Sequence, residues 1–484
     1  MPEKQIKFNA PALSYLNDEA ITKIHHSSLK ILANTGSKIC HPAAGDLLKK
    51  NKVDISPDGR AYIPESLVKW ALEKAPSCIT LHDRSQKPAM FLEKNNVYYG
   101  TGSDCQYLLD PTTGEPVAFT FDQMQDAVRV ADSLPHIDFI MGMGLAAELE
   151  DATVFQKKYW AMLKNSTKPQ VLICGPDINA LEDIVEMGAA VAGSRELLTR
   201  YPRFLLLVDP TSPLVHSGEA LEKLMFMAKN CLPVIYAPGI MAGATSPVTM
   251  AGAIAQANAE ILAGLVIHQL ANPGAPFVYG GGMSPMDMKS SQPTYSAPEA
   301  MMAQAGLCQM SRDFYHLPTW GFGGCSASKR CDAQAINEAA TYNLSAAWMG
   351  TNLVHDVGYL EFGITYSLEL LVLCNEFIGQ VRRLMDGIVV DDEHLALDAI
   401  DRVGPGGSFL IDPHTLSHFK NNWQPDLTDR RTRKTWARTG GLSMEIRANE
   451  RVRSIIDTHI PAPLEDGILK KLNQIIQSAE NRSH

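Results

Sequence analysis

The sequence predicts an α/β fold: a (β/α)8 TIM barrel with a helical N-terminal extension and a C-terminal extension. Between Pro238 and Gly280, an Ala/Gly-rich helical segment lies between two strand-like runs that both end in glycine. Ser246 is the expected N-cap of this helix and Pro247 its first residue. Eight strand-like runs alternate with eight helical segments along the chain, which is the count that this barrel requires.

The expected strands are short runs rich in β-branched and aromatic residues. In chain order they begin at Val97, Ile137, Gln170, Arg203, Pro233, Pro276, Pro318 and Thr351. The connecting segments carry apolar residues at helical spacing. They run from Asp122 to Ser133, Ala152 to Asn165, Ile178 to Val191, Gly218 to Lys229, Val248 to Leu270, Ala297 to Arg312, Ala333 to Met349 and Thr365 to Met385.

Three regions are expected along the chain. Residues 1–92 form a helical N-terminal extension that covers one end of the barrel, with helical patterns from Asp18 to Asn34 and from Pro64 to Glu73. Residues 93–390 form the catalytic barrel, and residues 391–484 form a C-terminal extension packed on it. An insertion after the first strand carries a hairpin turn at Thr112, Thr113 and Gly114.

Composition narrows the classes of partner. A formal charge of −10 without long runs of like charge argues against nucleic acid and against an anionic membrane, since both reward a basic face. The first ten residues contain no apolar core of a signal peptide, and polar residues interrupt every long apolar run. A cytoplasmic protein that binds a small molecule or another protein is expected, and its oligomeric state is left open, a homo-oligomer included.

Several common catalytic motifs are missing. The nine cysteines form no Cys-x-x-Cys pair, so reduced thiols are expected and no metal site is indicated. The run GMGLAA mimics a dinucleotide fingerprint only in part, because Ala147 replaces its third glycine. The sequence contains no G-x-S-x-G elbow, H-E-x-x-H pair or phosphate loop. NAD-binding, hydrolase and phosphate-loop interpretations therefore lose their basis.

Glycines and aromatic residues gather where the expected strands end, and a barrel's chemistry lies at the C-terminal ends of its strands. The glycines leave a wide mouth, although turn geometry alone explains many single glycines. Aromatic faces above such a mouth bind quaternary ammonium ions by cation–π attraction. The aromatic and histidine residues at these ends are Tyr98, Tyr99, Tyr236, Tyr279, Trp320, Phe322, His355 and Tyr359.

Three long motifs resemble the trimethylamine methyltransferase superfamily, whose members move a methyl group from an amine to a corrinoid cobalt. They are GATSPVTMAGAIAQANAEILAGLVIHQ with PGAPFVYG, GFGGCSASKRCDAQAINEAA, and VGPGGSFLIDPHTLSHFKNNWQPDLTDRR. The segment HDVGYLEFG resembles the family's segment after the last barrel strand. The resemblance implies that cobalamin, carried by a separate cognate corrinoid protein, is the methyl acceptor.

The resemblance also implies a branch of the family. The founding members insert pyrrolysine near the mouth, whereas this chain contains only standard residues. Its absence points away from trimethylamine and towards the branch that resembles glycine betaine methyltransferases. A quaternary amine leaves as a neutral tertiary amine, so the enzyme has to supply alignment and desolvation rather than an acid.

The expected site follows from the resemblance together with the strand ends. His355 is the expected catalytic residue. Substrate contacts are expected from Tyr99, Tyr279, Phe322, His355 and Tyr359. Contacts with the corrin ring are expected from Gly280, Gly281, Gly282, Gly323, Gly324 and Ser326. Lys329 is a further candidate donor to a substrate carboxylate.

Other functions stay open. Proline betaine or carnitine could replace glycine betaine as substrate, and a non-catalytic betaine-binding barrel would use the same aromatic cage. A lyase that forms a Schiff base is disfavoured because none of the eight strand-like runs contains a lysine.

Overall fold

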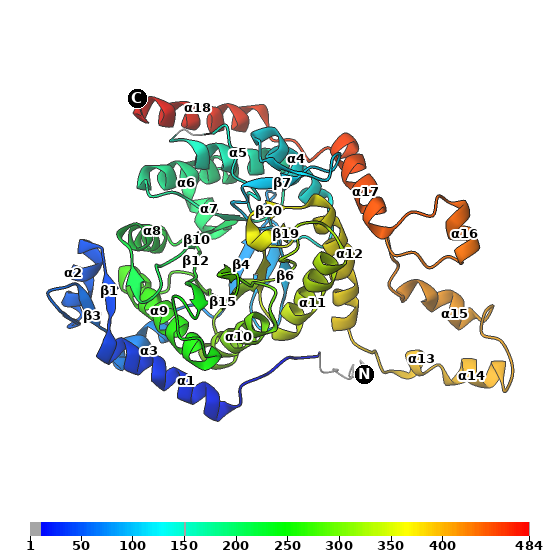
Figure 1. Cartoon of the computed structure of the whole chain (residues 1–484), viewed down its shortest axis with the longest axis horizontal. Helices are drawn as coiled ribbons and strands as arrows, with labels where there is room; N and C mark the ends of the chain where they lie inside the picture. Colours follow the sequence, from blue (N-terminus) through cyan, green and yellow to red (C-terminus); the bar gives the residue numbers. More distant parts are fainter. Residues whose placement is uncertain (1–10, 150–151, 484) are drawn as a thin grey trace.

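Seven parallel strands form the centre of the protein. The computed structural model describes residues 11–149 and 152–483 (Figure 1). One sheet has the order β14-β12-β10-β9 and the other the order β17-β18-β6. Their bounds are β6 (Tyr98–Tyr99), β9 (Gln170–Leu172), β10 (Phe204–Val208), β12 (Val234–Tyr236), β14 (Phe277–Tyr279), β17 (Trp320–Phe322) and β18 (Leu353–His355). The α/β prediction is confirmed, and these are seven of the eight strands expected from the sequence.

The two sheets meet only through isolated parallel bridges. Gly100 bridges to Phe139, Ile140 to Gln170, and Tyr279 to Thr319. The eighth expected strand, from Ile137, is therefore reduced to single bridges between β6 and β9. Among the described residues no continuous hydrogen-bonded ladder closes the ring, which is where the structure differs from the predicted closed barrel.

Helices surround the strands in the predicted alternation. They are α4 (Phe121–Ser133), α5 (Val154–Asn165), α6 (Ile178–Ala192), α7 (Arg195–Arg200), α8 (Gly218–Lys229), α9 (Met250–Ala271), α10 (Pro298–Cys308), α11 (Ala333–Met349) and α12 (Leu368–Met385). Side-chain caps begin many of them: Thr120 and Gln123 form a reciprocal capping box on α4, and Asp332 caps α11. A π-helical turn, η2 (Gln309–Tyr315), continues α10.

Helix α9 begins later than the sequence predicts. Its N-cap is Thr249 rather than Ser246, because the backbone of Ser246 closes a turn with Met241 and Gly243. The helix is long and apolar enough to cross a membrane by composition, but 83% of its most apolar window is buried inside the protein. It packs against α1, α3, α8 and α10, so its apolar character reflects its place in the core.

The strands separate two apolar cores. Alternate residues, among them Val171, Leu205, Ile235 and Val278, form an inner cluster that contains no helix residue, which we call the lumen. The intervening residues belong to the core between strands and helices. A hairpin of β4 (Ile79–His82) and β5 (Pro88–Leu92) closes the N-terminal end of the lumen with Ile79, Leu81, Met90 and Leu92.

The N-terminal extension contains strands that the sequence did not predict. Its helices are α1 (Asp18–Lys30) with η1 (Ile31–Thr35), α2 (Pro42–Lys50) and α3 (Glu65–Lys74). Strands β1 (Ser37–Ile39), β2 (Asp54–Ile55) and β3 (Arg60–Tyr62) form a sheet with β11 (Val215–His216). The first ten residues, where a signal peptide was excluded, lie outside the described residues.

Short strands extend the C-terminal ends of the barrel strands. β7 (Tyr107–Leu109) and β8 (Pro116–Ala118) form the predicted hairpin and join β19 (Tyr359–Leu360) and β20 (Thr365–Tyr366) in one sheet. η3 (Glu361–Gly363) connects β19 to β20. A second small sheet contains β13 (Gly239–Ala242), β15 (Gly282–Asp287) and β16 (Gln292–Pro293).

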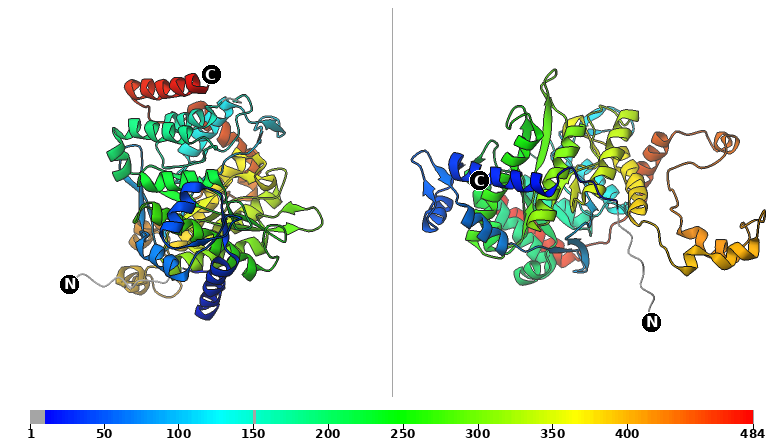
Figure 2. Two further views of the ribbon diagram at one scale, coloured as in Figure 1. Left: turned by 90° about the vertical axis from the view of Figure 1, so that its left-hand side faces the viewer. Right: turned by 90° about the horizontal axis from the view of Figure 1, so that it is seen from below.

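The C-terminal region has two different parts. Helix α17 (Met444–Thr458) packs on α12 and α4, and α18 (Asp466–Ser483) packs on α5 and α6. Between α12 and α17 the chain projects sideways from the barrel (Figures 1 and 2). The projecting elements are α13 (Asp392–Leu395), α14 (Leu397–Val403), α15 (Pro413–His418), η4 (Phe419–Asn421) and α16 (Arg433–Arg438).

Candidate active site at the lumen end of the strands

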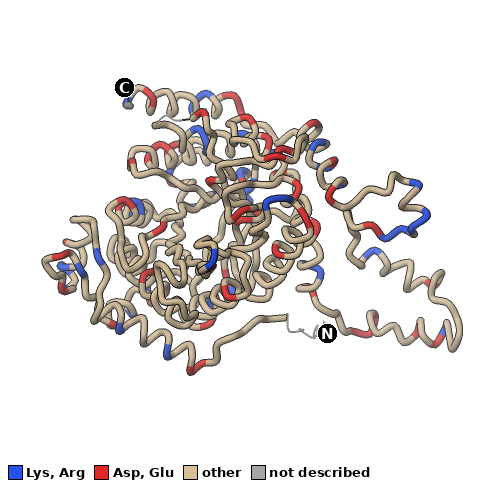
Figure 3. The backbone as a smooth tube through the Cα atoms, viewed as in Figure 1, with Lys and Arg blue, Asp and Glu red and all other residues tan. Residues whose placement is uncertain are grey.

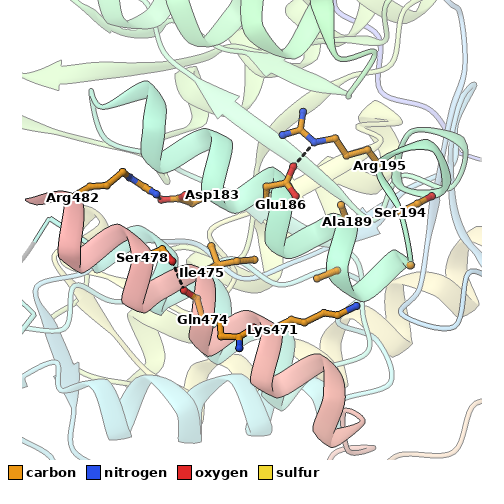
Figure 4. Close-up of a pocket in the computed structure, with 12 residues that line it drawn as sticks. Asp183, Glu186, Ala189, Ser194, Arg195, Lys471, Gln474, Ile475, Ser478 and Arg482 are labelled. Atoms are coloured by element: carbon orange, nitrogen blue, oxygen red, sulfur yellow. Dashed lines mark hydrogen bonds and ion pairs between the residues drawn. The ribbon is translucent and has the colours of Figure 1, made fainter.

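One surface pocket lies at the periphery of the protein. It has a volume of about 460 Å³ and lies between α6 and α18 (Figure 4). Two ion pairs lie in it, Arg482 with Asp183 and Arg195 with Glu186. Only helices and the turn after α6 line it, away from the strand ends where barrel enzymes bind substrate. We therefore place the candidate site in the lumen.

Three aromatic rings meet at the C-terminal end of the lumen. Phe322 ends β17 opposite His355, which ends β18, and both share the inward parity of Trp320. The His355 and Trp320 rings stack with centroids 4.1 Å apart and planes 13° apart. The Phe322 ring lies 4.8 Å from His355. The alternation of strand side chains therefore gives one continuous aromatic surface on adjacent strands.

Tyr295 extends this surface from the loop beyond β16. Its ring stacks on Phe322 with centroids 5.5 Å apart and planes 20° apart. Burial, and to a smaller extent the Asp356 carboxyl, raises the pKa of the Tyr295 hydroxyl to about 12. The hydroxyl therefore stays protonated at neutral pH and can donate a hydrogen bond.

His355 has one occupied and one free ring nitrogen. Its Nδ1 lies 2.5 Å from Oδ1 of Asp356, and both side chains are almost fully buried. Its Nε2 is buried and contacts no hydrogen-bonding partner within the described part of the chain. A buried polar atom without a partner costs stability, so such an atom at a strand end marks a place where a ligand group can bind.

Carboxylates lie beside the aromatic surface. Asp209 directly follows β10 and is open to solvent, yet desolvation by the surrounding protein raises its pKa to about 6, with His355 and Lys223 opposing the shift. Asp104 also lies within Coulombic range of Asp209, and Nζ of Lys158 donates to its Oδ1 at 2.7 Å.

Two of the predicted cage tyrosines lie outside the lumen. The Tyr99 hydroxyl donates to the carbonyl of Asn343 in α11 at 2.8 Å, and the Tyr279 hydroxyl donates to Oδ1 of Asn258 in α9 at 2.9 Å. Both side chains are fully buried in the core between strands and helices. Their positions along the strands direct both side chains towards the helices and away from the lumen, so neither belongs to the proposed site.

Tyr359 packs against the loop after β6, and its contact with the substrate stays a prediction. Its ring occupies the space beside Gly102, where an added Cβ would lie 2.2 Å from it. Its hydroxyl contacts both the backbone N–H and the carbonyl of Ser103. The residue thereby fixes the loop after β6, which carries Asp104.

The chain's own atoms fill the space beside each predicted rim glycine. A Cβ on Gly281 would meet Ile261 and Leu307 of the helices, and one on Gly323 would meet Val354. On Gly280 it would meet Ala237 at 2.6 Å, and on Gly282 it would meet the Phe322 ring at 1.7 Å. Gly324 has a φ of +61°. Close packing and backbone geometry thus account for these five glycines, and their contact with a corrin ring stays a prediction.

Ser326 is engaged within its own loop. Its hydroxyl donates to Oε2 of Glu338 at 2.6 Å, and the same carboxylate accepts the Ala327 N–H. Lys329 is exposed, and its Nζ donates to the carbonyl of Ala327. Both residues shape the loop after β17, and contact of Ser326 with the corrin also stays a prediction.

The sequence analysis did not select Asp209, Asp356 or Tyr295. The position of Asp209 in the sequence could have indicated a functional role, because a carboxylate directly after an apolar strand lies at the functional edge of a barrel. The position of Asp356 could have indicated a role as well, since it directly follows His355 in the chain. Nothing in the sequence indicated Tyr295, because its place depends on how the loop through β15 and β16 folds back.

Comparison with known proteins identifies the family. The family model for trimethylamine methyltransferase (MTTB) matches residues 1–483. The chain belongs to the trimethylamine methyltransferase (MTTB) family. It is 31% identical over 470 residues to the trimethylamine methyltransferase MttB of Desulfitobacterium hafniense, covering 97% of this chain and 94% of the relative. It is 29% identical over 471 residues to a glycine betaine methyltransferase from the same species, covering 96% and 97%.

The fold comparison agrees. The crystal structure of the Methanosarcina barkeri monomethylamine methyltransferase (MtmB) superposes with a TM-score of 0.53 at 10% sequence identity, covering 92% of this chain and 88% of that one. The resemblance stated from the motifs is thus confirmed. This MTTB family member is a methyltransferase, and methylation of a corrinoid protein is a property of the family as a whole.

Proposed function

We propose that this MTTB family protein, on a (β/α)8-barrel scaffold, demethylates a quaternary amine bound at the lumen end of β17 and β18. Glycine betaine is the proposed substrate, and the reduced corrinoid of a cognate cytoplasmic protein is the methyl acceptor. The observation that carries the proposal is the surface of Trp320, Phe322 and His355 beside Asp209. A quaternary ammonium cannot donate a hydrogen bond, so aromatic faces and a nearby carboxylate are the groups that hold it.

The residues present fit the reaction. The bond between nitrogen and methyl carbon breaks with its electron pair kept by nitrogen, and the cobalt supplies the pair that forms the new bond. Because dimethylglycine leaves as a neutral amine, no proton has to be delivered. The chain's task is to hold the ammonium against Phe322 and His355, exclude water, and direct one methyl group towards the mouth.

His355 supports a substrate that also carries a carboxylate. Asp356 lies next to Nδ1, which assigns the proton of the neutral ring to that nitrogen and leaves a lone pair on Nε2. Nε2 is the nitrogen of this buried ring that has no hydrogen-bonding partner in the described part of the chain, so it is the atom that a substrate group can reach. A betaine can place its carboxylate there, with one proton shared between the carboxylate and Nε2, whereas trimethylamine has no second polar group for this position.

The test is a methyl-transfer assay that follows the conversion of cobalt(I) to methylcobalt(III) by absorption. The substrates are glycine betaine, proline betaine, carnitine and trimethylamine, with chemically reduced cobalamin as acceptor. Glycine betaine is expected to react fastest, and trimethylamine not at all. Equal or faster turnover of trimethylamine would overturn the proposed substrate. Betaine binding without turnover, with the corrinoid protein also supplied, would instead indicate a binding protein.

A further inference from the structure

The segment from 387 to 422, which we call the arm, lacks a core of its own. It leaves the end of α12 and returns where Glu376 of α12 accepts the N–H groups of Asp426 and Thr428 at 3.1 and 2.8 Å. Both ends are thus attached to the barrel, while α13, α14 and α15 project sideways (Figure 2, right). Within the arm only Ala399 and Asp412 are buried.

The arm exposes a dense group of apolar side chains. Half of the large hydrophobic residues that are exposed in the described chain lie between residues 388 and 419. The most exposed are Ile388 at 78%, Leu397 at 66%, Leu410 at 78% and Ile411 at 81%. Single exposed apolar residues are ordinary, but a group this dense marks a surface that another protein covers.

Charge is distributed unequally between the arm and the loop that follows it. The arm contains six acidic residues, Asp391, Asp392, Glu393, Asp398, Asp401 and Asp412, and only two basic residues, Arg402 and Lys420. The segment from Arg430 to Arg438, which we call the basic loop, contains five basic residues and no acidic one (Figure 3). Among the described residues, no ion pair joins the two segments within one molecule; Arg402, for example, pairs with Asp412.

We propose that two copies of this chain pair through their arms, so that the acidic arm of each lies against the basic loop of the other. In a two-fold symmetric dimer every contact occurs twice: if the arm of one copy lies on the basic loop of the other, the arm of the second copy also lies on the basic loop of the first. One chain that carries both an acidic and a basic segment satisfies this requirement. The exposed apolar residues of the two arms form the core of the contact.

The occupant is a second copy rather than the methyl-accepting partner. A corrinoid protein has to leave after each turnover, and interfaces of transient complexes are about as polar as the rest of the surface. A permanently exposed apolar arm instead matches the hydrophobic interfaces of obligate homodimers. The arm also projects from the side of the barrel rather than from the strand ends that hold the candidate site (Figure 2).

The mass of the full chain in solution tests the pairing. Light scattering after gel filtration is expected to give a dimer, or a larger assembly built from dimers. The double variant Leu410→Glu with Ile411→Glu is expected to halve the mass. The matched control is Ile460→Glu, which changes an 87% exposed apolar residue outside the arm and is expected to keep the wild-type mass. A monomeric wild-type protein, or an arm variant of unchanged mass, overturns the proposal.

A charge exchange tests which segments meet and separates pairing from misfolding. One variant carries Asp392→Lys, Asp398→Lys and Asp401→Lys, which leaves the arm with three acidic and five basic residues. The other carries Arg433→Glu, Lys434→Glu and Arg438→Glu, which leaves the basic loop with two basic and three acidic residues. Each alone is expected to be monomeric, because both segments of each copy then have the same sign. An equimolar mixture is expected to dimerise, since each altered segment meets an opposite charge. If the mixture stays monomeric while each variant keeps the wild-type circular dichroism, the arm does not contact the partner's basic loop.

Discussion

The two faces of the barrel strands use aromatic residues differently. On the helix-facing side, Tyr99, Tyr236 and Tyr279 have hydroxyls that contact a helix carbonyl, a histidine ring and an asparagine amide. On the lumen side, Phe322 is partly exposed and His355 keeps Nε2 without a partner. Satisfied polar atoms contribute stability, whereas an unsatisfied one is a cost that a ligand can remove. The first face should therefore determine folding, and the second binding.

The largest effect is expected on the helix-facing side. Tyr279→Ala leaves a cavity beside α9 and removes a partner of Asn258, so the free energy of unfolding should fall by about 3 to 5 kcal/mol. The matched variant Tyr279→Phe should lose only about 1 to 3 kcal/mol, because just the hydroxyl is removed. Urea denaturation measures both changes. If folded Tyr279→Phe protein binds betaine more weakly while its stability is unchanged, Tyr279 belongs to the site after all.

A substitution of Asp209 should affect substrate binding and leave stability intact, the reverse of the effect expected at Tyr279. Asp209→Asn removes a carboxylate within Coulombic range of His355 and should lower kcat/KM for glycine betaine by about 10- to 100-fold, or roughly 1.4 to 2.7 kcal/mol. Its folded-state pKa is raised to about 6, above the unfolded value, so ionising it costs stability at neutral pH. The variant should therefore be at least as stable as wild type at pH 7. A variant less stable at pH 7, with unchanged kcat/KM, would assign Asp209 a structural role.

The same carboxyl predicts a pH dependence. As pH falls through about 6, Asp209 takes up a proton and the wild-type KM for the cation should rise. Over this range the folded state binds the proton that the unfolded state does not yet bind, so the contribution of this group to stability increases as the pH falls. Michaelis constants measured between pH 5 and 8 check the expectation, because the KM of Asp209→Asn should not rise in this way as the pH falls.

The smallest expected effect concerns the aromatic surface itself. Phe322→Leu keeps the apolar bulk and removes the π face, which should weaken substrate binding by about 0.5 to 2 kcal/mol. That corresponds to a rise in KM of roughly 2- to 30-fold. Stability should change by less than about 1.5 kcal/mol. An unchanged KM would remove Phe322 from the cage and leave only the stacked pair of Trp320 and His355.

The contrast between the two faces also shows what the sequence could predict. The order of strands and helices followed from their spacing and composition. Which side chains of each strand face the lumen could not be predicted, because strands buried on both faces carry apolar residues at every position. Tyr98 and Tyr99 are equivalent in the sequence, yet only Tyr98 packs against the lumen cluster. Phe322 and His355 were correctly expected at strand ends, but choosing them over Tyr279 requires the three-dimensional register.

The arm was hidden for a similar reason. Residues such as Leu410 and Ile411 are typical of a packed core in the sequence, and nothing in their spacing indicates that the chain leaves them exposed. Asp209 is an intermediate case. Its position after a strand was visible, but the desolvation that raises the pKa of its carboxyl depends on how the chain folds around it. His355 and Lys223, which oppose that shift, come from distant parts of the chain.

The hairpin of β4 and β5 constrains the kinetic order of the proposed reaction. It fills the N-terminal end of the lumen with Leu81, Met90 and their neighbours, which leaves the C-terminal ends of the strands as the one entrance to the proposed site. The amine and the methyl acceptor must then share that entrance. The small substrate has to enter first, the large carrier closes the opening, and the demethylated amine can leave only after the carrier departs. Steady-state rates should therefore follow a compulsory-order sequential scheme, with excess carrier trapping the amine inside.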